Sequence, residues 1–237
     1  MRQNAWIAVA ATTLATLAVS SPAAASTTIT HETFADASGL VLNGTAAVTG
    51  GVLRLTSGQR NQAGAAWSAT TVDPGVAFDT TFDVRTSGPA VHADGFAFVV
   101  QTDGSRAIGG LGGSLGYGGM TRSVAVEFDT YRNRGEIDGN HVAVVTGGLA
   151  GAHRASAAAP VPIFGGRLHV RIEYAPEAKR LTVALRRAGE PWTHVLTREV
   201  DLAETLGTGR AHVGFTAATG RSVSTQDIVS WRLAQAG

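Results

Sequence analysis

Short runs of alternating apolar and polar residues dominate this sequence after its first 25 residues. Side chains alternate between the two faces of a β-strand, so runs of about five to nine residues bounded by Gly, Pro, Asp or Asn predict strands. The clearest runs are VLRLT (52–56), AFDTTFDV (77–84), GFAFVVQ (95–101), VAVEFDTY (124–131), HVAVVT (141–146), LHVRIEYA (168–175), RLTVALRRA (180–188), AHVGFTAA (211–218) and DIVSWRL (227–233). Only DLAETL (201–206) has a helical pattern, and it spans little more than one turn. Many short strands without long helices predict an all-β fold, a sandwich or jelly roll.

The first 25 residues have the pattern of a secretory signal peptide. Arg2 precedes the apolar segment IAVAATTLATLAV (7–19), and the small residues of SPAAAS place the cleavage site after Ala25. The apolar segment is short for a membrane span, and no later run reaches the roughly 18 apolar residues that a span needs. We therefore expect a secreted, extracellular protein without a membrane span. No linker interrupts residues 26–237, which predicts one domain over that range.

Composition limits the possible partners and the source of stability. The chain has 19 basic and 18 acidic residues, whereas a nucleic-acid surface needs a basic excess, so we expect no nucleic-acid partner. It has no cysteine, so the domain must depend on its hydrophobic core instead of disulfides. Lys179 is the only lysine, which we interpret as coding bias of a GC-rich genome.

The stretch VAVEFDTYRNRGEIDGNHVAVV (124–145) gathers acidic side chains at the end of one predicted strand. Alternation places Glu127, Asp129, Tyr131 and Asn133 on one face, opposite the apolar residues of the strand. Like charges about 6.7 Å apart along a strand repel each other unless something neutralises or uses them. A cation, a pair of catalytic acids and plain solvent are the three explanations that the pattern leaves open.

A metal site is the first of these explanations. A hard divalent cation prefers oxygen ligands, and Glu127, Asp129, Asn133 and Asp138 offer them within twelve residues. His141 adds an imidazole, which manganese or another transition ion accepts more readily than calcium does. This set suggests two adjacent ions that share Asp129. The alternative is a solvated acidic loop beside a surface histidine.

Two catalytic explanations fit the sequence less well. GGSLG (112–116) matches the GxSxG nucleophile motif, but that motif requires a strand and a helix around it, whereas here it lies in the glycine-rich loop GGLGGSLGYGG (109–119). Glu127 and Asp129 could form a glycosidase carboxylate pair. Sugar-cleaving jelly rolls of the laminarinase type carry a third carboxylate, and Arg132 stands at that position here. We therefore expect no enzyme.

The same residues carry a family resemblance. VAVEFDTYRN followed by DGNHVAV resembles the metal-binding segment of the legume-type (L-type) lectins, a jelly-roll family with a concanavalin-like fold. Further segments are similar to other parts of that family in the same order, and together they cover roughly residues 32–233: LVLNGTAAVTGGVLRLTSGQRNQAGAAW (40–67), HADGFAFVVQ (92–101), GGSLGY (112–117), VGFTAATG (213–220) and DIVSWRL (227–233). On this basis the chain is identified as a bacterial-like, secreted member of the family.

The resemblance implies calcium and manganese, or another transition metal, as structural cofactors that fix the sugar-binding loops. Glu127, Asp129 and His141 match the manganese-side ligands. Asp129, the backbone carbonyl of Tyr131, Asn133 and an acidic loop residue match the calcium-side ligands.

That acidic loop residue has two candidates, because the loop from Asn133 to His141 is shorter than is common in the family. Asp138 corresponds by counting forward from Asn133, and Glu136 by counting back from His141; we prefer Asp138. Six other histidines have no ligand-like spacing and are expected at surface or hydrogen-bonded positions: His31, His92, His153, His169, His194 and His212.

The resemblance also implies a sugar site. Asp94 matches the aspartate that accepts hydrogen bonds from two sugar hydroxyls, and in the family the peptide bond before it is cis. Gly113 matches the glycine whose N–H donates to the sugar. The other expected contacts are the side-chain amide of Asn133, the ring of Tyr131, and the last loop with Arg221 and Ser222.

The resulting prediction is a metal-dependent, non-catalytic lectin whose partners are glycans or glycoconjugates. Sugar sites of this kind are shallow, so we expect an affinity near the millimolar level, about 4 kcal/mol, at a single site. Edge-to-edge pairing into a homodimer is possible, as in plant relatives. Two alternatives stay open: a glycoside hydrolase of related fold, and a structural or adhesive module whose sugar site has decayed.

Overall fold

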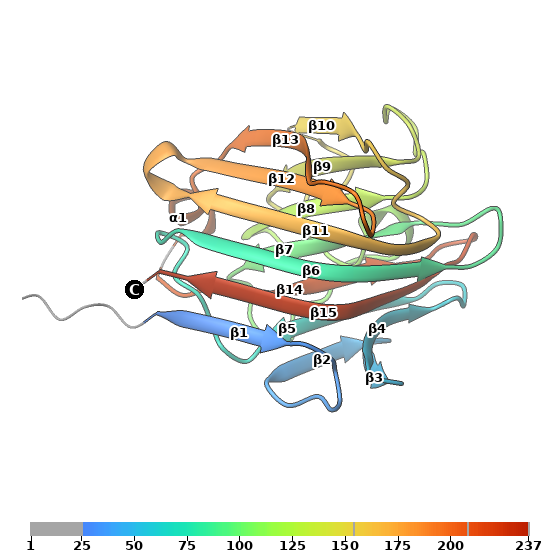
Figure 1. Cartoon of the computed structure of the whole chain (residues 1–237), viewed down its shortest axis with the longest axis horizontal. Coiled ribbons are helices and arrows are strands. Elements are labelled where there is room, and N and C mark those ends of the chain that lie inside the picture. Colours follow the sequence, from blue (N-terminus) through green and yellow to red (C-terminus); the bar gives the residue numbers. More distant parts are fainter. Residues whose placement is uncertain (1–25, 154, 208, 237) are drawn as a thin grey trace, which may run out of the picture.

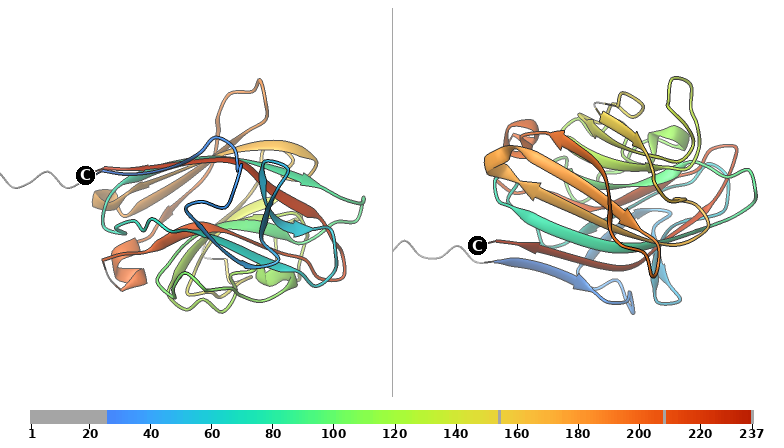
Figure 2. Two further views of the ribbon diagram at one scale, coloured as in Figure 1. Left: turned by 90° about the horizontal axis from the view of Figure 1, so that it is seen from below. Right: turned by 45° about the horizontal axis from the view of Figure 1, so that its top comes forward.

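The computed structural model describes residues 26–153, 155–207 and 209–236. The expected signal peptide, residues 1–25, lies outside this range. Two antiparallel sheets lie face to face (Figures 1 and 2), which confirms the predicted all-β sandwich. The helical elements of the described residues are α1 (Leu202–Leu206) and the 3₁₀ turns η1 (Gly112–Ser114) and η2 (Pro176–Ala178). No helix there has the length and apolar character to span a bilayer.

The first sheet has eight strands in the order β13-β12-β11-β6-β15-β4-β3, with β1 also paired to β15. Its strands are β1 (Thr27–His31), β3 (Ala47–Thr49), β4 (Val52–Ser57), β6 (Phe78–Ser87), β11 (Gly166–Ala175), β12 (Arg180–Arg186), β13 (Thr193–Glu199) and β15 (Thr225–Gln235). Apolar residues alternate along its central strands, so one face packs inward and the other carries charged side chains.

The second sheet has seven strands in the order β10-β9-β8-β7-β14-β5-β2. Its strands are β2 (Leu40–Gly44), β5 (Ala63–Ser68), β7 (Gly95–Gln101), β8 (Ser123–Asp129), β9 (His141–Thr146), β10 (Ala155–Ala158) and β14 (His212–Ala218). Every residue of β7 and β8 is buried, which shows that both faces of this sheet are covered.

The main core fills the space between the sheets. Phe82 of β6 packs edge-on against Phe215 of β14 and Phe128 of β8, with ring centroids 4.8 and 5.9 Å apart. Trp231 of β15 also packs edge-on against Phe215, at 5.0 Å. Aromatic rings from both sheets therefore interlock at the centre, and this packing fixes where the ends of β7 and β8 lie.

The long β7–β8 connection covers the outer face of the seven-stranded sheet. Leu115, Tyr117 and Met120 from this loop are buried against a second apolar cluster that includes Trp67. The indole Nε1 of Trp67 donates a hydrogen bond to the backbone carbonyl of Ala107 at 2.9 Å. Dense glycines in this loop therefore permit close packing against the sheet: a Cβ at position 116 would lie 2.7 Å from the carbonyl oxygen of Ala217.

Each of the nine clearest predicted runs overlaps a strand, and 201–206 contains α1. The helix begins after Asp201, whose side chain accepts a hydrogen bond from the Glu204 N–H. Strands β1, β2, β3, β5, β10 and β13 were not among those runs. They are short or lie near sheet edges, and β10 (ASAA) has no apolar–polar alternation to detect.

Gly214 provides a test of the sheet packing. A Cβ there would lie 2.0 Å from the carbonyl oxygen of Ala66 on the neighbouring strand β5. We expect Gly214→Ala to lower the free energy of unfolding by about 1–3 kcal/mol or more, because the strands must separate to admit the methyl group. Gly209→Ala is the matched control, since its Cβ would meet no described atom within 4 Å. Urea denaturation of both variants measures the difference, and equal midpoints would contradict the proposed packing.

Candidate functional site

The end of β8 places Glu127 and Asp129 on the face of the sheet that is opposite the core residue Phe128. Glu127 is 1% exposed and Asp129 is 2% exposed. In the sheet register, Asp129 lies beside Gly95 of β7 on one side and His141 of β9 on the other. The two carboxylates are therefore held side by side in the interior, where an uncompensated charge is costly.

Glu127 contacts the loop that covers the sheet. One carboxylate oxygen accepts a short hydrogen bond from the hydroxyl of Tyr117. Burial and the charge of Glu127 raise the pKa of the Tyr117 hydroxyl, so this group stays protonated and acts as the donor. The contact ties the β7–β8 loop to the acidic cluster.

Asp129 has an altered protonation equilibrium. Burial raises the pKa of its carboxyl to about 8, and the negative charges of Glu136, Glu127 and Asp94 add to the shift. The backbone N–H of Tyr131 opposes it by donating to Oδ1 at 2.7 Å. A nearby cation would stabilise the ionised form in the same way that an opposite charge lowers a carboxyl pKa.

The β8–β9 loop brings Glu136, not Asp138, to the cluster. Glu136 is 7% exposed, and its Oε2 accepts a hydrogen bond from the Asn133 N–H at 2.5 Å. The side chain of Asp138 is 43% exposed, and its Oδ1 accepts from the Asn140 N–H at 2.8 Å. The geometry therefore favours Glu136, the competitor in the sequence prediction, because the side chain of Asp138 is used to shape the turn.

His141 is oriented as a ligand would be. Its Nδ1 lies 2.8 Å from the backbone carbonyl of Asp138, which accepts the ring proton. This contact leaves Nε2 as the free lone pair, and Nε2 is buried without a hydrogen-bond partner among the described residues. A histidine that binds a metal commonly donates its other ring N–H to a carbonyl in this way.

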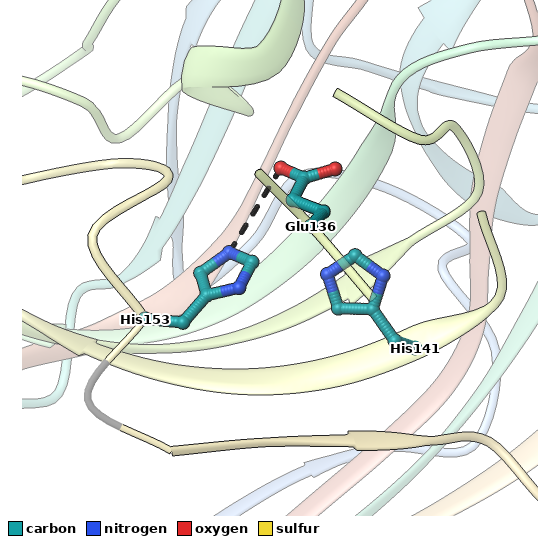
Figure 3. A group of neighbouring side chains, drawn as sticks. All are labelled: Glu136, His141 and His153. Atoms are coloured by element: carbon teal, nitrogen blue, oxygen red, sulfur yellow. Dashed lines mark ion pairs between the residues drawn. The ribbon is translucent and has the colours of Figure 1, made fainter. Parts of the chain in front are cut away.

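His153 is the residue that the sequence prediction missed. It was expected at a surface or hydrogen-bonded position, but its side chain is only 11% exposed and its Nε2 lies 2.9 Å from Oε2 of Glu127. Figure 3 shows its ring and that of His141 on either side of the Glu136 carboxylate. It lies in the β9–β10 loop, and no spacing or pattern in the sequence linked it to the acidic stretch.

These donors fit a divalent cation. Donor atoms of Glu136, His141 and His153 all lie within 4.8 Å of one another. Oε2 of Glu127 and Nε2 of both histidines are buried and lack hydrogen bonds of suitable geometry within the described chain. Buried polar atoms without partners each cost about 1–3 kcal/mol, and one cation would satisfy all three.

Asp94 lies at the start of β7, beside this cluster. The Ala93–Asp94 peptide bond is cis, as the family resemblance implied. The backbone carbonyl of Asp94 accepts hydrogen bonds from the N–H and hydroxyl of Thr130, at 2.9 and 3.0 Å, which tie Asp94 to the end of β8. Burial raises the pKa of the Asp94 carboxyl to about 6, and the charge of Glu136 adds to the shift. Its Oδ2 is buried without a described hydrogen-bond partner.

Glycines from two loops surround that carboxylate. Cβ atoms built at Gly112 and Gly220 would lie 3.8 and 3.5 Å from Asp94 Oδ2. A Cβ at Gly113 would lie 3.0 Å from Nδ2 of Asn133. Asp94, Gly113 and Asn133 therefore converge on one small area, and only a residue without a side chain leaves it open.

The other residues predicted to contact a sugar are Tyr131, Arg221 and Ser222. Tyr131 is 40% exposed, so its ring is available at the surface. Arg221 is exposed and Ser222 is half-buried on the β14–β15 loop after Gly220. Among the described hydrogen bonds, none joins the side chain of Arg221 or Ser222 to Asp94.

Comparison with known protein families identifies the family to which this fold belongs. The family model of the legume lectin β-barrel domain matches residues 29–230. The chain belongs to the L-type lectin family. Lectins bind carbohydrate without catalysis, so the comparisons agree with the expectation of a non-enzymatic protein.

Individual relatives are plant proteins. A lectin-related protein of Cladrastis kentukea is 30% identical over 164 residues, which cover 64% of this chain and 53% of the relative. The chain spans about half the length of the curated relatives it matches first. These plant relatives give no support to the expected bacterial-like origin.

Solved structures share the fold over nearly their whole length. The basic winged bean lectin with Tn-antigen is 26% identical and has a TM-score of 0.79. The match covers 90% of this chain and 99% of that lectin. Lectin I-B4 from Griffonia simplicifolia in a metal-free form is 25% identical, also with a TM-score of 0.79. The match covers 88% of this chain and 99% of that lectin.

The Tyr117–Glu127 contact can be tested by removing one oxygen. We expect Tyr117→Phe to lower the free energy of unfolding in chelator by about 1–3 kcal/mol, because the buried Glu127 carboxylate loses a donor. Tyr131→Phe is the control, since that ring is exposed and its hydroxyl makes no hydrogen bond with a described residue. Guanidinium denaturation compares the two, and an unchanged Tyr117→Phe midpoint would show that the contact does not stabilise the loop.

Proposed function

We propose that this chain is a secreted lectin whose sugar site is organised by a calcium ion and an adjacent transition-metal ion. The observation that carries the proposal is the convergence of Asp94, Gly113 and Asn133 beside a buried cluster of unpaired ligand atoms. Protein, metal and sugar are coupled in this arrangement because Asn133 contributes to both parts of the site.

The ligand sets follow from burial and orientation. Glu127, Asp129, Glu136 and His141 would hold the transition-metal ion, since all four are buried around one point at the ends of β8 and β9. Asp129, Glu136, the side-chain oxygen of Asn133 and the carbonyl of Tyr131 would hold calcium, which favours oxygen ligands. When bound, the ions neutralise the carboxylates and fix the loop between β8 and β9. Asp138 has no part in this set.

The proposed sugar contacts combine a charged acceptor, hydrogen-bond donors and an aromatic ring. Asp94 offers a charged acceptor for hydroxyl groups, the backbone of Gly113 offers an N–H, and Asn133 offers an amide. The exposed ring of Tyr131 offers a flat apolar surface to the sugar ring. The winged bean lectin, described with Tn-antigen, supports a glycan or glycoconjugate as the partner class. Arg221 and Ser222 would act at the rim, where they select among sugars.

The alternatives receive less support. A glycoside hydrolase would need an acid near the Glu127–Asp129 pair, but Arg132 occupies the third position, and its Nε donates to the backbone carbonyl of Glu136 at 3.1 Å. A structural or adhesive module with a decayed site would not require Asp94, Gly113 and Asn133 to remain together. The signal-like pattern of the first 25 residues supports secretion. A homodimer would use the edge strand β1, which pairs only with β15 in the described chain.

Glycan binding after chelation and after Asp94→Asn tests the proposal. We expect a glycan array in calcium and manganese to give signals that EDTA abolishes and that metal restores. Asp94→Asn should weaken the strongest interaction at least about tenfold, because a charged acceptor contributes roughly 1.5–3 kcal/mol to such hydrogen bonds. Asp36→Asn, an exposed aspartate on the β1–β2 connection, is the matched control and should bind as the parent does.

Three results would count against the proposal. Binding that is insensitive to both EDTA and Asp94→Asn would exclude this site. Metal uptake without any glycan signal would support the structural or adhesive module. Release of reducing ends from a polysaccharide, abolished by Glu127→Gln, would support the hydrolase.

A further inference from the structure

We propose that His153 is a direct second imidazole ligand of the transition-metal ion, so that this site selects an ion of the zinc, cobalt or nickel class over manganese. The inference rests on the proposed metal-dependent function and makes one part of it more specific. It concerns a histidine from the β9–β10 loop, outside the acidic stretch that carries the other ligands.

The position of His153 is that of a ligand. Its Nε2 lies 2.9 Å from Oε2 of Glu127 and 4.0 Å from Oε1 of Glu136. The ring centroids of His153 and His141 are 5.1 Å apart, and the planes are inclined at 55°. Figure 3 shows the two rings approaching the same carboxylate from different segments of the chain. Two imidazoles and two carboxylates thus surround one point.

The contact between His153 and Glu127 has ion-pair distance but not hydrogen-bond geometry. Although Nε2 and Oε2 are 2.9 Å apart, each is buried and neither has a hydrogen bond of suitable geometry within the described chain. His141 Nε2 is in the same condition and is 0% exposed as a side chain. A ring nitrogen of His141 lies within 4.8 Å of one of His153, and Nε2 of His153 lies 2.9 Å from Oε2 of Glu127, so one cation could bind all three residues.

The second imidazole changes which ion is preferred. Manganese and calcium favour carboxylate, carbonyl and water oxygens, whereas imidazole nitrogen suits zinc, cobalt, nickel and copper. A site with His141 alone accepts manganese readily. Adding His153 gives the site a second nitrogen donor, and this increases affinity for the nitrogen-preferring ions more than for manganese. Glu127, Asp129 and Glu136 remain as the oxygen ligands.

Counting nitrogen ligands tests the inference directly. The full chain is first stripped of metal, then saturated with calcium, and then given one equivalent of Cu²⁺. The imidazoles bound to Cu²⁺ are counted by electron spin echo modulation. We expect two imidazoles in the parent and one in His153→Gln. His194→Gln, an exposed histidine on the eight-stranded sheet, is the matched control and should still show two.

Competition between ions gives a second measurement. In calorimetry with Zn²⁺ and Mn²⁺, His153→Gln should lose at least about tenfold in zinc affinity, while manganese affinity changes much less. One imidazole in the parent, or an unchanged ratio of zinc to manganese affinity in the variant, would overturn the inference and leave the proposed lectin function intact. If neither ion binds the parent, the proposed function itself fails. The parent spectrum needs no variant, so misfolding of His153→Gln cannot hide the answer.

Discussion

Buried negative charge at one end of the seven-stranded sheet is the constraint on which the rest of the site depends. Asp94, Glu127, Asp129 and Glu136 are each less than 8% exposed, and the only side-chain ion pairs described for them involve His153. Transferring an unpaired carboxylate from water into a protein costs several kcal/mol, so this arrangement requires protons or cations. The raised pKa values of Asp94 and Asp129 are the consequence when protons supply the neutralisation. Cations would supply it while leaving the carboxylates ionised.

The fold positions these charges through three layers. The interlocked aromatic core holds β7 and β8 in register, and this register places Gly95, Asp129 and His141 in one row across three strands. The β7–β8 loop packs on the outer face of the sheet, and Tyr117 connects it to Glu127. The same loop carries Gly112 and Gly113 to Asp94 and Asn133. Changes at the ion cluster should therefore alter the loop that would contact a sugar.

Much of this arrangement could be predicted from the sequence because it depends on local pattern. Alternation alone put Glu127 and Asp129 opposite Phe128, and ordered motifs located Asp94 and Gly113. Two parts could not be predicted in this way. The choice between Glu136 and Asp138 depends on how the shortened loop turns, and the turn uses the carboxylate of Asp138 to hold Asn140. His153 reaches the cluster only through the path of the β9–β10 loop, which no periodicity encodes.

Metal content is the most direct measurement of the central claim that the buried carboxylates exist to bind ions. Purified protein, incubated with calcium and a transition metal and then passed through a desalting column, should retain about one ion of each kind per chain by elemental analysis, as two adjacent sites sharing Asp129 require. Asp129→Asn should reduce the retained amount of both ions, because the account places this side chain between the two sites. A parent protein that retains no divalent ion, even after incubation with excess, would contradict the account.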